Sequence, residues 1–196
     1  SNKPDVTGPK LLSVSVVQSD ELLLLFNEKL EKPLITNLFS ITPSTGISLA
    51  AFPSISLREV KLKLTQNLVP RTLYRVAISN LRDCNGNYIQ EKYNELSFAL
   101  PEAAEIGDLL INEVLFNPRP GGVDFVEIIN SSEKFINLKN WSVANQDGAL
   151  VNTKIITSSD LIFSPQDYLL FTSDKNLVIN QYPTSVAEKF FETVLP

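Results

Sequence analysis

Hydrophobic and polar positions alternate along short stretches of this chain. In EVKLKLT (59–65), Val and Leu occupy every second position and Glu or Lys lies between them, the pattern of a strand with one face in water. Similar runs rich in Leu and β-branched residues recur along the chain, separated by turn residues at roughly the 8–12-residue spacing of sandwiches and barrels. Helical periodicity is nearly absent, so the pattern predicts an all-β protein.

The runs predict fourteen strands, seven in each half of the chain. The predicted strands are 11–17, 21–26, 38–42, 47–52, 59–65, 73–79 and 95–100, then 109–116, 125–130, 135–138, 141–145, 153–157, 161–164 and 168–172. The segment LPEAAEIGD (100–108) breaks the pattern and reads as a linker. We therefore expect two Ig-like or fibronectin-like β-sandwich domains in tandem, residues 1–103 and 104–196. The segment 174–183 predicts one or two helical turns, and 185–196 has no clear pattern.

Composition narrows the classes of function. Of the 196 residues 43% are hydrophobic, enough for a core, but no run approaches the ~18 apolar residues of a membrane span. The chain has no Met, which indicates a processed or excised segment, and a single cysteine, Cys84, so it forms no internal disulfide. It also has no histidine, which excludes Ser-His-Asp and Cys-His catalysis and His-ligated zinc. We expect no catalytic residues and no cofactor.

Charge is unevenly distributed between the halves. Residues 1–103 carry 11 Lys and Arg against 10 Asp and Glu, whereas residues 104–196 carry 6 against 12, a net charge of −6. Phosphate backbones and anionic lipids need a basic face. We therefore expect no direct binding of nucleic acid.

The first half carries a motif around Tyr74. In LVPRTLYRVAISNLRDCNGNYI (68–89), the order Leu-Pro-Thr-Tyr before a strand resembles the tyrosine corner of Ig-like sandwiches, whose phenol bonds back to the backbone a few residues upstream. The loop RDCNGN (82–87) then supplies residues that tolerate φ > 0. Together these features resemble the bacterial Ig-like domains of surface-layer and other exported proteins, over about 100 residues.

The same loop raises a calcium hypothesis for Asp83, Asn85 and Asn87. An EF-hand loop places a Gly sixth and a Glu twelfth. Counted from Asp83, Gly86 is fourth and the twelfth residue, Asn94, is not acidic. A structural turn is the favoured interpretation, with a metal site as the alternative.

The second half begins with LLINEVLFNPRPGGVDFVEIINSSEKFINLKNWSVAN (109–145). Its I-x-E-V strand, Pro/Gly loop, D-F-V-E-I-x-N strand and Trp141 resemble the lamin tail domain, an Ig-like sandwich. Asn140 stands where that family usually has Gly, and Asn also tolerates the left-handed conformation. Trp141 lies in an apolar run and is expected in the core.

The resemblance implies that Glu113 and Glu127 lie on adjacent strands near loops. We expect these carboxylates, with the neighbouring Asp124, to be structural and to accept backbone N–H bonds. A divalent-cation site and a catalytic acid/base pair are the alternatives. Asn130, at the end of its strand, is expected to cap a turn.

The family pattern also predicts further strands beyond 161–174, which this chain does not supply. Residues 185–196 take their place, or an edge strand stays unpaired and becomes a template for another chain. We therefore expect a homodimer through an exposed edge strand.

The resemblances imply a non-catalytic module pair of a secreted, cell-surface or periplasmic bacterial protein. Its role would be display, spacing or attachment, through protein or glycan contacts at loops such as 117–122 and 145–149. The alternative is a pair of accessory domains of a larger exported hydrolase or nuclease whose catalytic part lies outside this chain. The nuclear-scaffold role of animal lamin tails, with DNA contacts, is opposed by the acidic second half.

Overall fold

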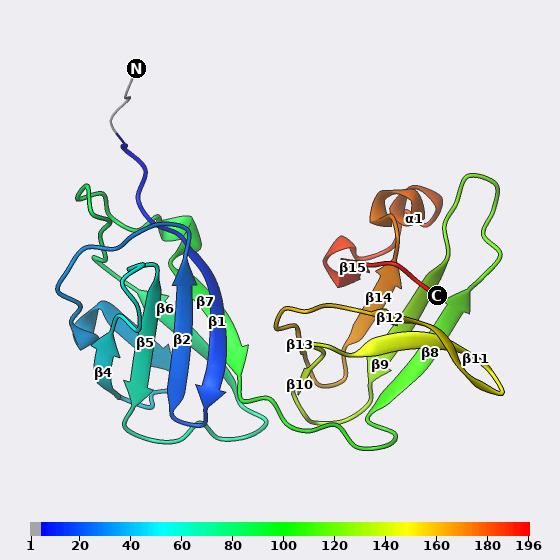
Figure 1. Cartoon of the computed structure of the whole chain (residues 1–196), viewed down its shortest axis with the longest axis horizontal. Helices are drawn as coiled ribbons and strands as arrows, with labels where there is room; N and C mark the ends of the chain where they lie inside the picture. Colours follow the sequence, from blue (N-terminus) through cyan, green and yellow to red (C-terminus); the bar gives the residue numbers. More distant parts are fainter. Residues whose placement is uncertain (1–4) are drawn as a thin grey trace. The chain divides into compact units, whose positions relative to one another are not determined.

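The computed structural model describes residues 5–196, apart from the side chain of Asp147. The chain divides into two compact units, which we call unit 1 (Ser1–Leu100) and unit 2 (Pro101–Pro196). Strands are the main regular elements of both units (Figure 1). None of the helices in the described residues is long and apolar enough to cross a membrane.

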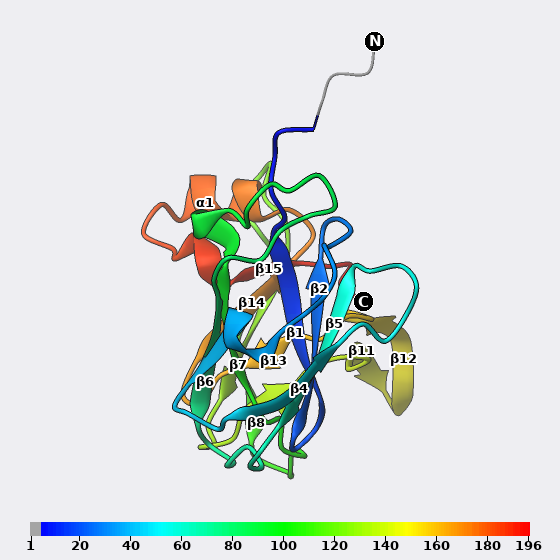
Figure 2. The same ribbon diagram turned by 90° about the vertical axis from the view of Figure 1, so that its left-hand side faces the viewer.

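Unit 1 is a sandwich of seven strands. The strands are β1 (Leu11–Gln18), β2 (Glu21–Phe26), β3 (Phe39–Thr42), β4 (Ile47–Ala51), β5 (Glu59–Leu64), β6 (Leu73–Ile78) and β7 (Glu95–Ala99), with short 3-10 turns at Thr36–Leu38 and Glu91–Tyr93. One sheet has the order β1-β2-β5-β4 and the other β3-β6-β7 (Figure 2). This four-plus-three arrangement is that of constant-type Ig domains and confirms the predicted fold. Each strand coincides with a predicted one to within one residue at either end.

The core of unit 1 forms between the two sheets. Its side chains come from alternate positions of facing strands, among them Leu22, Leu24 and Phe26 of β2, Val60, Leu62 and Leu64 of β5, and Val76 and Ile78 of β6. Burying each such side chain contributes about 1.5–3 kcal/mol. The period-2 pattern of the sequence therefore determines which face of each strand lies inside.

Tyr74 forms the predicted tyrosine corner. Its side chain is 3% exposed, and its phenol oxygen accepts the backbone N–H of Val69 at 2.9 Å. Its ring stacks on Phe98 with 5.6 Å between centroids. The bond ties the segment entering β6 to the strand itself.

Unit 2 contains eight strands and one helix. They are β8 (Leu109–Leu115), β9 (Phe125–Asn130), β10 (Ile136–Asn137), β11 (Ser142–Asp147), β12 (Ala149–Ile155), β13 (Ile162–Phe163), β14 (Tyr168–Thr172), α1 (Lys175–Gln181), the 3-10 turn Ala187–Lys189 and β15 (Phe190–Glu192). The main sheet has the order β15-β14-β9-β8, and β10-β13 and β11-β12 form two small sheets. The helix confirms the turns predicted in 174–183, and Asp174 caps it by accepting the N–H groups of Asn176 and Leu177.

Different elements pack on the two faces of the main sheet of unit 2. On one face, Ile128 and Phe171 pack with Ile136, Leu138 and Phe163. On the other face, Phe125 and Leu170 pack with Val178 of α1 and Tyr182. Unit 2 thus has a core of its own.

Two expectations for unit 2 change, those for the loop 145–149 and for Trp141. The expected loop 145–149 lies in a hairpin, since β11 runs to Asp147 and β12 starts at Ala149, with Gly148 at φ 67°; an Asp-Gly pair favours a tight hairpin turn. Residues 190–192 form β15, parallel to β14, so the segment 185–196 supplies a strand, which was one of the two alternatives. Trp141 is 39% exposed rather than in the core, and it lines a hollow of unit 2. Asn140 takes φ 62°, as its tolerance of the left-handed region predicts.

Candidate functional site

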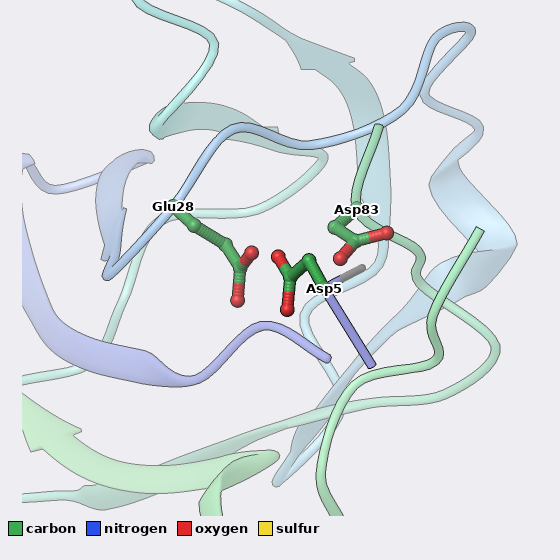
Figure 3. Close-up of side chains that lie close together, drawn as sticks. All are labelled: Asp5, Glu28 and Asp83. Carbon is green, nitrogen blue, oxygen red and sulfur yellow. The ribbon is translucent and has the colours of Figure 1, made fainter. Parts of the chain in front are cut away.

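Three carboxylates meet at one end of unit 1. Asp5 comes from the segment before β1, Glu28 from the loop after β2 and Asp83 from the loop between β6 and β7. Their side chains point toward one another (Figure 3), with one oxygen of each within 4.8 Å of the others. We call these residues the carboxylate cluster.

Asp83 is the anchor of the carboxylate cluster. It is buried, and its Oδ1 accepts the backbone N–H groups of Asn85 and Asn87, each at 2.8 Å, while Oδ2 accepts the Asn87 side-chain amide at 2.9 Å. Burial by itself raises the pKa of a carboxyl group, but these bonds and one from the Gly86 backbone outweigh it and lower the pKa of Asp83. Asp83 is therefore held as a carboxylate that organises the loop.

Asp5 ties the N-terminal segment to the same loop. Its Oδ1 accepts the N–H of Thr7 at 3.0 Å, and its Oδ2 accepts the Asn85 side-chain amide at 3.3 Å. Its backbone carbonyl accepts the Asn87 side-chain amide at 3.2 Å. The two asparagines thus link segments that are 80 and 82 residues apart in the sequence.

Glu28 is the member of the carboxylate cluster whose pKa is raised. Burial is the largest cause that raises its pKa, and the negative charges of Asp83 and Asp5 raise it further. The Asn27 side-chain amide, which donates to Oε1 at 3.2 Å, lowers it in part. Glu28 consequently holds its proton to a higher pH than an exposed Glu.

In the described part of the chain these three side chains form the group that could hold a divalent cation. Hard cations such as calcium take carboxylate oxygens of this kind. Of the residues considered from sequence, Asp83 belongs to the cluster, whereas Asn85 and Asn87 act as hydrogen-bond donors to it. Sequence reasoning missed Asp5 and Glu28, because nothing in local spacing shows that the three segments converge.

Unit 2 holds the other predicted residues. Glu113 and Glu127 face each other directly across β8 and β9, and the Asn112 side-chain amide donates to Glu127 Oε1 at 2.6 Å. This partner is a side chain, rather than the loop backbone we expected. Asp124 is exposed just before β9, and its backbone carbonyl accepts the Thr172 hydroxyl at 2.9 Å.

Asn130 caps the turn after β9, as predicted. It is fully buried. Its amide nitrogen donates to the carbonyls of Lys134, Phe163 and Ser164 at 2.8–3.2 Å, and its Oδ1 accepts from both the backbone and the hydroxyl of Ser132. One side chain thereby joins the loop after β9 to the segment after β13.

An apolar groove opens in unit 2 between β8 and β9 on one side and β11 on the other. It has a volume of about 290 Å³, and its lining includes Ile111, Val126, Trp141 and Val143. A second hollow of about 180 Å³ shares Ile111, Val126 and Val143 and extends to Phe116. We call the two together the apolar groove. The sequence marks these residues as apolar but does not show that they are left uncovered.

Comparison with protein families matches both units. The bacterial Ig-like domain model matches residues 2–99, and the Lamin Tail Domain model matches residues 102–192. The chain belongs to these two families, in that order. The bacterial Ig-like domain thus contributes the carboxylate cluster, and the lamin tail domain contributes the apolar groove.

Solved structures similar to this tandem are fragments of an S-layer protein. The N-terminal part of the bacterial S-layer protein SbsC has a TM-score of 0.43 and 20% identity, over 81% of this chain and 44% of that one. The S-layer protein rSbsC(31-844) has a TM-score of 0.42 and 16% identity, over 84% and 32%. The chain spans less than half the length of these structures. No curated protein matches it significantly.

Proposed function

We propose that the chain is a non-catalytic module pair of a secreted, cell-surface or periplasmic bacterial protein. It spaces, displays or attaches other parts of that protein through protein or glycan contacts at the ends of its sandwiches. The observation that carries this proposal is the tandem of two β units with separate hydrophobic cores, each from a family of Ig-like domains. Such units suit a role in which each domain positions other parts of the protein and carries out no reaction.

The hydrogen bonds of Asp83 support a structural role for the carboxylates of unit 1. The carboxylate of Asp83 is ionised, and it accepts three hydrogen bonds from its own loop. A general base needs a free acceptor near a substrate, and a general acid needs a poised proton within reach of one. The bonds of Asp83 instead order the loop between β6 and β7, which keeps a sandwich-end surface in one shape for binding.

The loop 117–122 supports contacts at the end of unit 2. It joins β8 to β9, and Arg119 and Pro120 in it are exposed. Gly122 passes so close to Gln181 of α1 that a Cβ there would lie 2.7 Å from the Gln181 side-chain oxygen. The loop is thus braced against the helix while its tip presents a cationic side chain.

A binding screen tests this proposal. The purified chain is heated alone and with solubilised peptidoglycan, wall polysaccharide or short duplex DNA, and the unfolding midpoint is followed. A ligand that binds only the folded state raises the midpoint, by the equivalent of about 2.7 kcal/mol at 100 times its Kd. We expect a rise with a wall glycan and none with DNA, and Arg119→Ala reports whether loop 117–122 takes part.

Enzyme assays on the same preparation test the opposite hypothesis, that the chain is catalytic. We expect no turnover of nuclease, phosphatase or glycosidase substrates above that of heat-denatured chain. Turnover that disappears in Glu113→Gln or Glu127→Gln would overturn the non-catalytic assignment and make that carboxylate pair an acid/base site.

A further inference from the structure

The strand β8 is an unprotected edge of the main sheet of unit 2. It pairs with β9 on one side only, since the sheet order is β15-β14-β9-β8. Five of its seven residues are Leu, Ile or Val, and its one charge is Glu113. Natural edge strands are commonly blunted by Lys, Pro or a covering segment. β8 has a bulge at Asn112, but it carries neither Lys nor Pro.

Apolar side chains are exposed on β8 and beyond its end. Ile111 is 66% exposed and Phe116 82%, and both line the apolar groove. The strand β12, which pairs with the groove strand β11, is exposed at every residue, including Leu150 and Ile155. Figure 1 shows the β11–β12 hairpin crossing beside β8 and β9. Monomeric proteins rarely leave a contiguous apolar surface of more than a few hundred Å² open to water.

The size and charge of this surface fit a second copy of the chain. We define the open face as the 20 different residues that line the two hollows of the apolar groove. A standard interface uses about 20–30 residues a side. Asp124 is the one charged side chain among them. Apart from Asp124, the acidic side chains of residues 104–196 therefore lie off the open face, and two like faces can approach.

We propose that the open face binds a second copy of this chain in a closed dimer, with the exposed backbone edge of β8 and the apolar groove buried between the two copies. A two-fold interface uses the same patch on both chains, so it closes at two copies and leaves no further edge of β8 free. Water released from the apolar side chains drives the association. This assembly is separate from attachment through the sandwich-end loops.

Analytical ultracentrifugation over a wide concentration range tests the dimer. One chain has a mass of 21.8 kDa, and we expect a reversible shift to twice that mass that stops there. The single Trp reports the location, because Trp141 lies in the apolar groove. Its emission should move to shorter wavelength over the same concentration range, as water leaves the groove.

Two variants and a matched control locate the contact. Ile111→Asp and Phe116→Asp place a charge in the groove at exposed positions, and each should weaken dimerisation at least 10-fold. Phe116 follows β8, so its replacement leaves the ladder intact if Ile111→Asp disturbs the fold. Ile55→Asp makes the same kind of change at a 97% exposed residue of unit 1 and should leave the dimer constant unchanged.

Three results would overturn the proposal. The first is a chain that stays monomeric at the highest concentration reached, and the second is growth past two copies. The third is a dimer that both groove variants retain, or that forms with no change in the emission of Trp141.

Discussion

Replacing Tyr74 with Phe isolates one hydrogen bond in unit 1. The ring remains, with its stacking on Phe98 at 5.6 Å, and only the oxygen that accepts the Val69 N–H at 2.9 Å is lost. A hydrogen bond of this kind contributes about 0.5–1.5 kcal/mol, and an unsatisfied buried partner costs about 1–3 kcal/mol. Because Val69 is itself exposed, water reaches its N–H in part, so we expect a loss of about 1–2 kcal/mol.

Two optical probes make the assay specific to one unit. Far-UV circular dichroism follows the strands of both units, whereas Trp fluorescence follows unit 2 alone, since Trp141 is the only Trp. A domain of this size loses about 4–8 °C in Tm for each kcal/mol. Tyr74→Phe should therefore lower the transition that dichroism assigns to unit 1 and leave the fluorescence transition in place.

Tyr168→Phe is the matched control, because its side chain is largely exposed on β14. It should leave both transitions where they are. If Tyr74→Phe unfolds at the same temperature as the control, the tyrosine corner does not stabilise unit 1 and the reasoning fails.

Three further substitutions test how polar side chains of the two units affect stability, each by thermal or urea unfolding. Asn130→Ala leaves several buried partners unsatisfied and should cost at least about 2 kcal/mol, seen as a lower midpoint of Trp141 emission; an unchanged midpoint would show that water replaces the amide. Asp83 has a lowered folded-state pKa, so its contribution is complete above the unfolded pKa and is lost as pH falls through the folded one. Asp83→Asn should thus destabilise unit 1 at pH 7 and flatten its acid dependence, and a parallel pH curve would contradict this. Glu28 has a raised pKa, so its ionisation opposes folding; Glu28→Gln should raise the midpoint at pH 7, with no gain once acid protonates the wild-type residue.

Unit 1 could be predicted from the sequence almost strand by strand. Its strands bury one face each, so the alternation in β2 and β5 gives both their limits and their orientation. Tyr74 and Asn130 were also predictable, because a phenol or amide at a strand end bonds to nearby backbone. The bonds of Tyr74 to Val69 and of Asn130 to Ser132 and Lys134 are local, and local spacing records them. The bonds of Asn130 to Phe163 and Ser164 are long-range, and spacing does not show them.

The carboxylate cluster and the apolar groove depend on long-range contacts. Asp5, Glu28 and Asp83 meet because three loops converge at one end of the sandwich, which no spacing in the sequence reveals. Trp141 was expected in the core because it lies in an apolar run, yet burial requires a second layer over it. The pattern of a strand tells which side chains are apolar, and only the topology tells whether another layer covers them.

Labelling of Cys84 tests export, the central claim of this account. Cys84 is the only cysteine of the chain and is exposed. Intact cells of the producing bacterium, and lysed cells, are treated with a maleimide that cannot cross the cytoplasmic membrane, with Cys84→Ser as the control. A module outside the cytoplasm predicts equal labelling of the protein in intact and lysed cells, lost in the control. The label is read on the proteolytic peptide that contains Cys84, and labelling of that peptide only after lysis would place the protein in the cytoplasm and contradict the account.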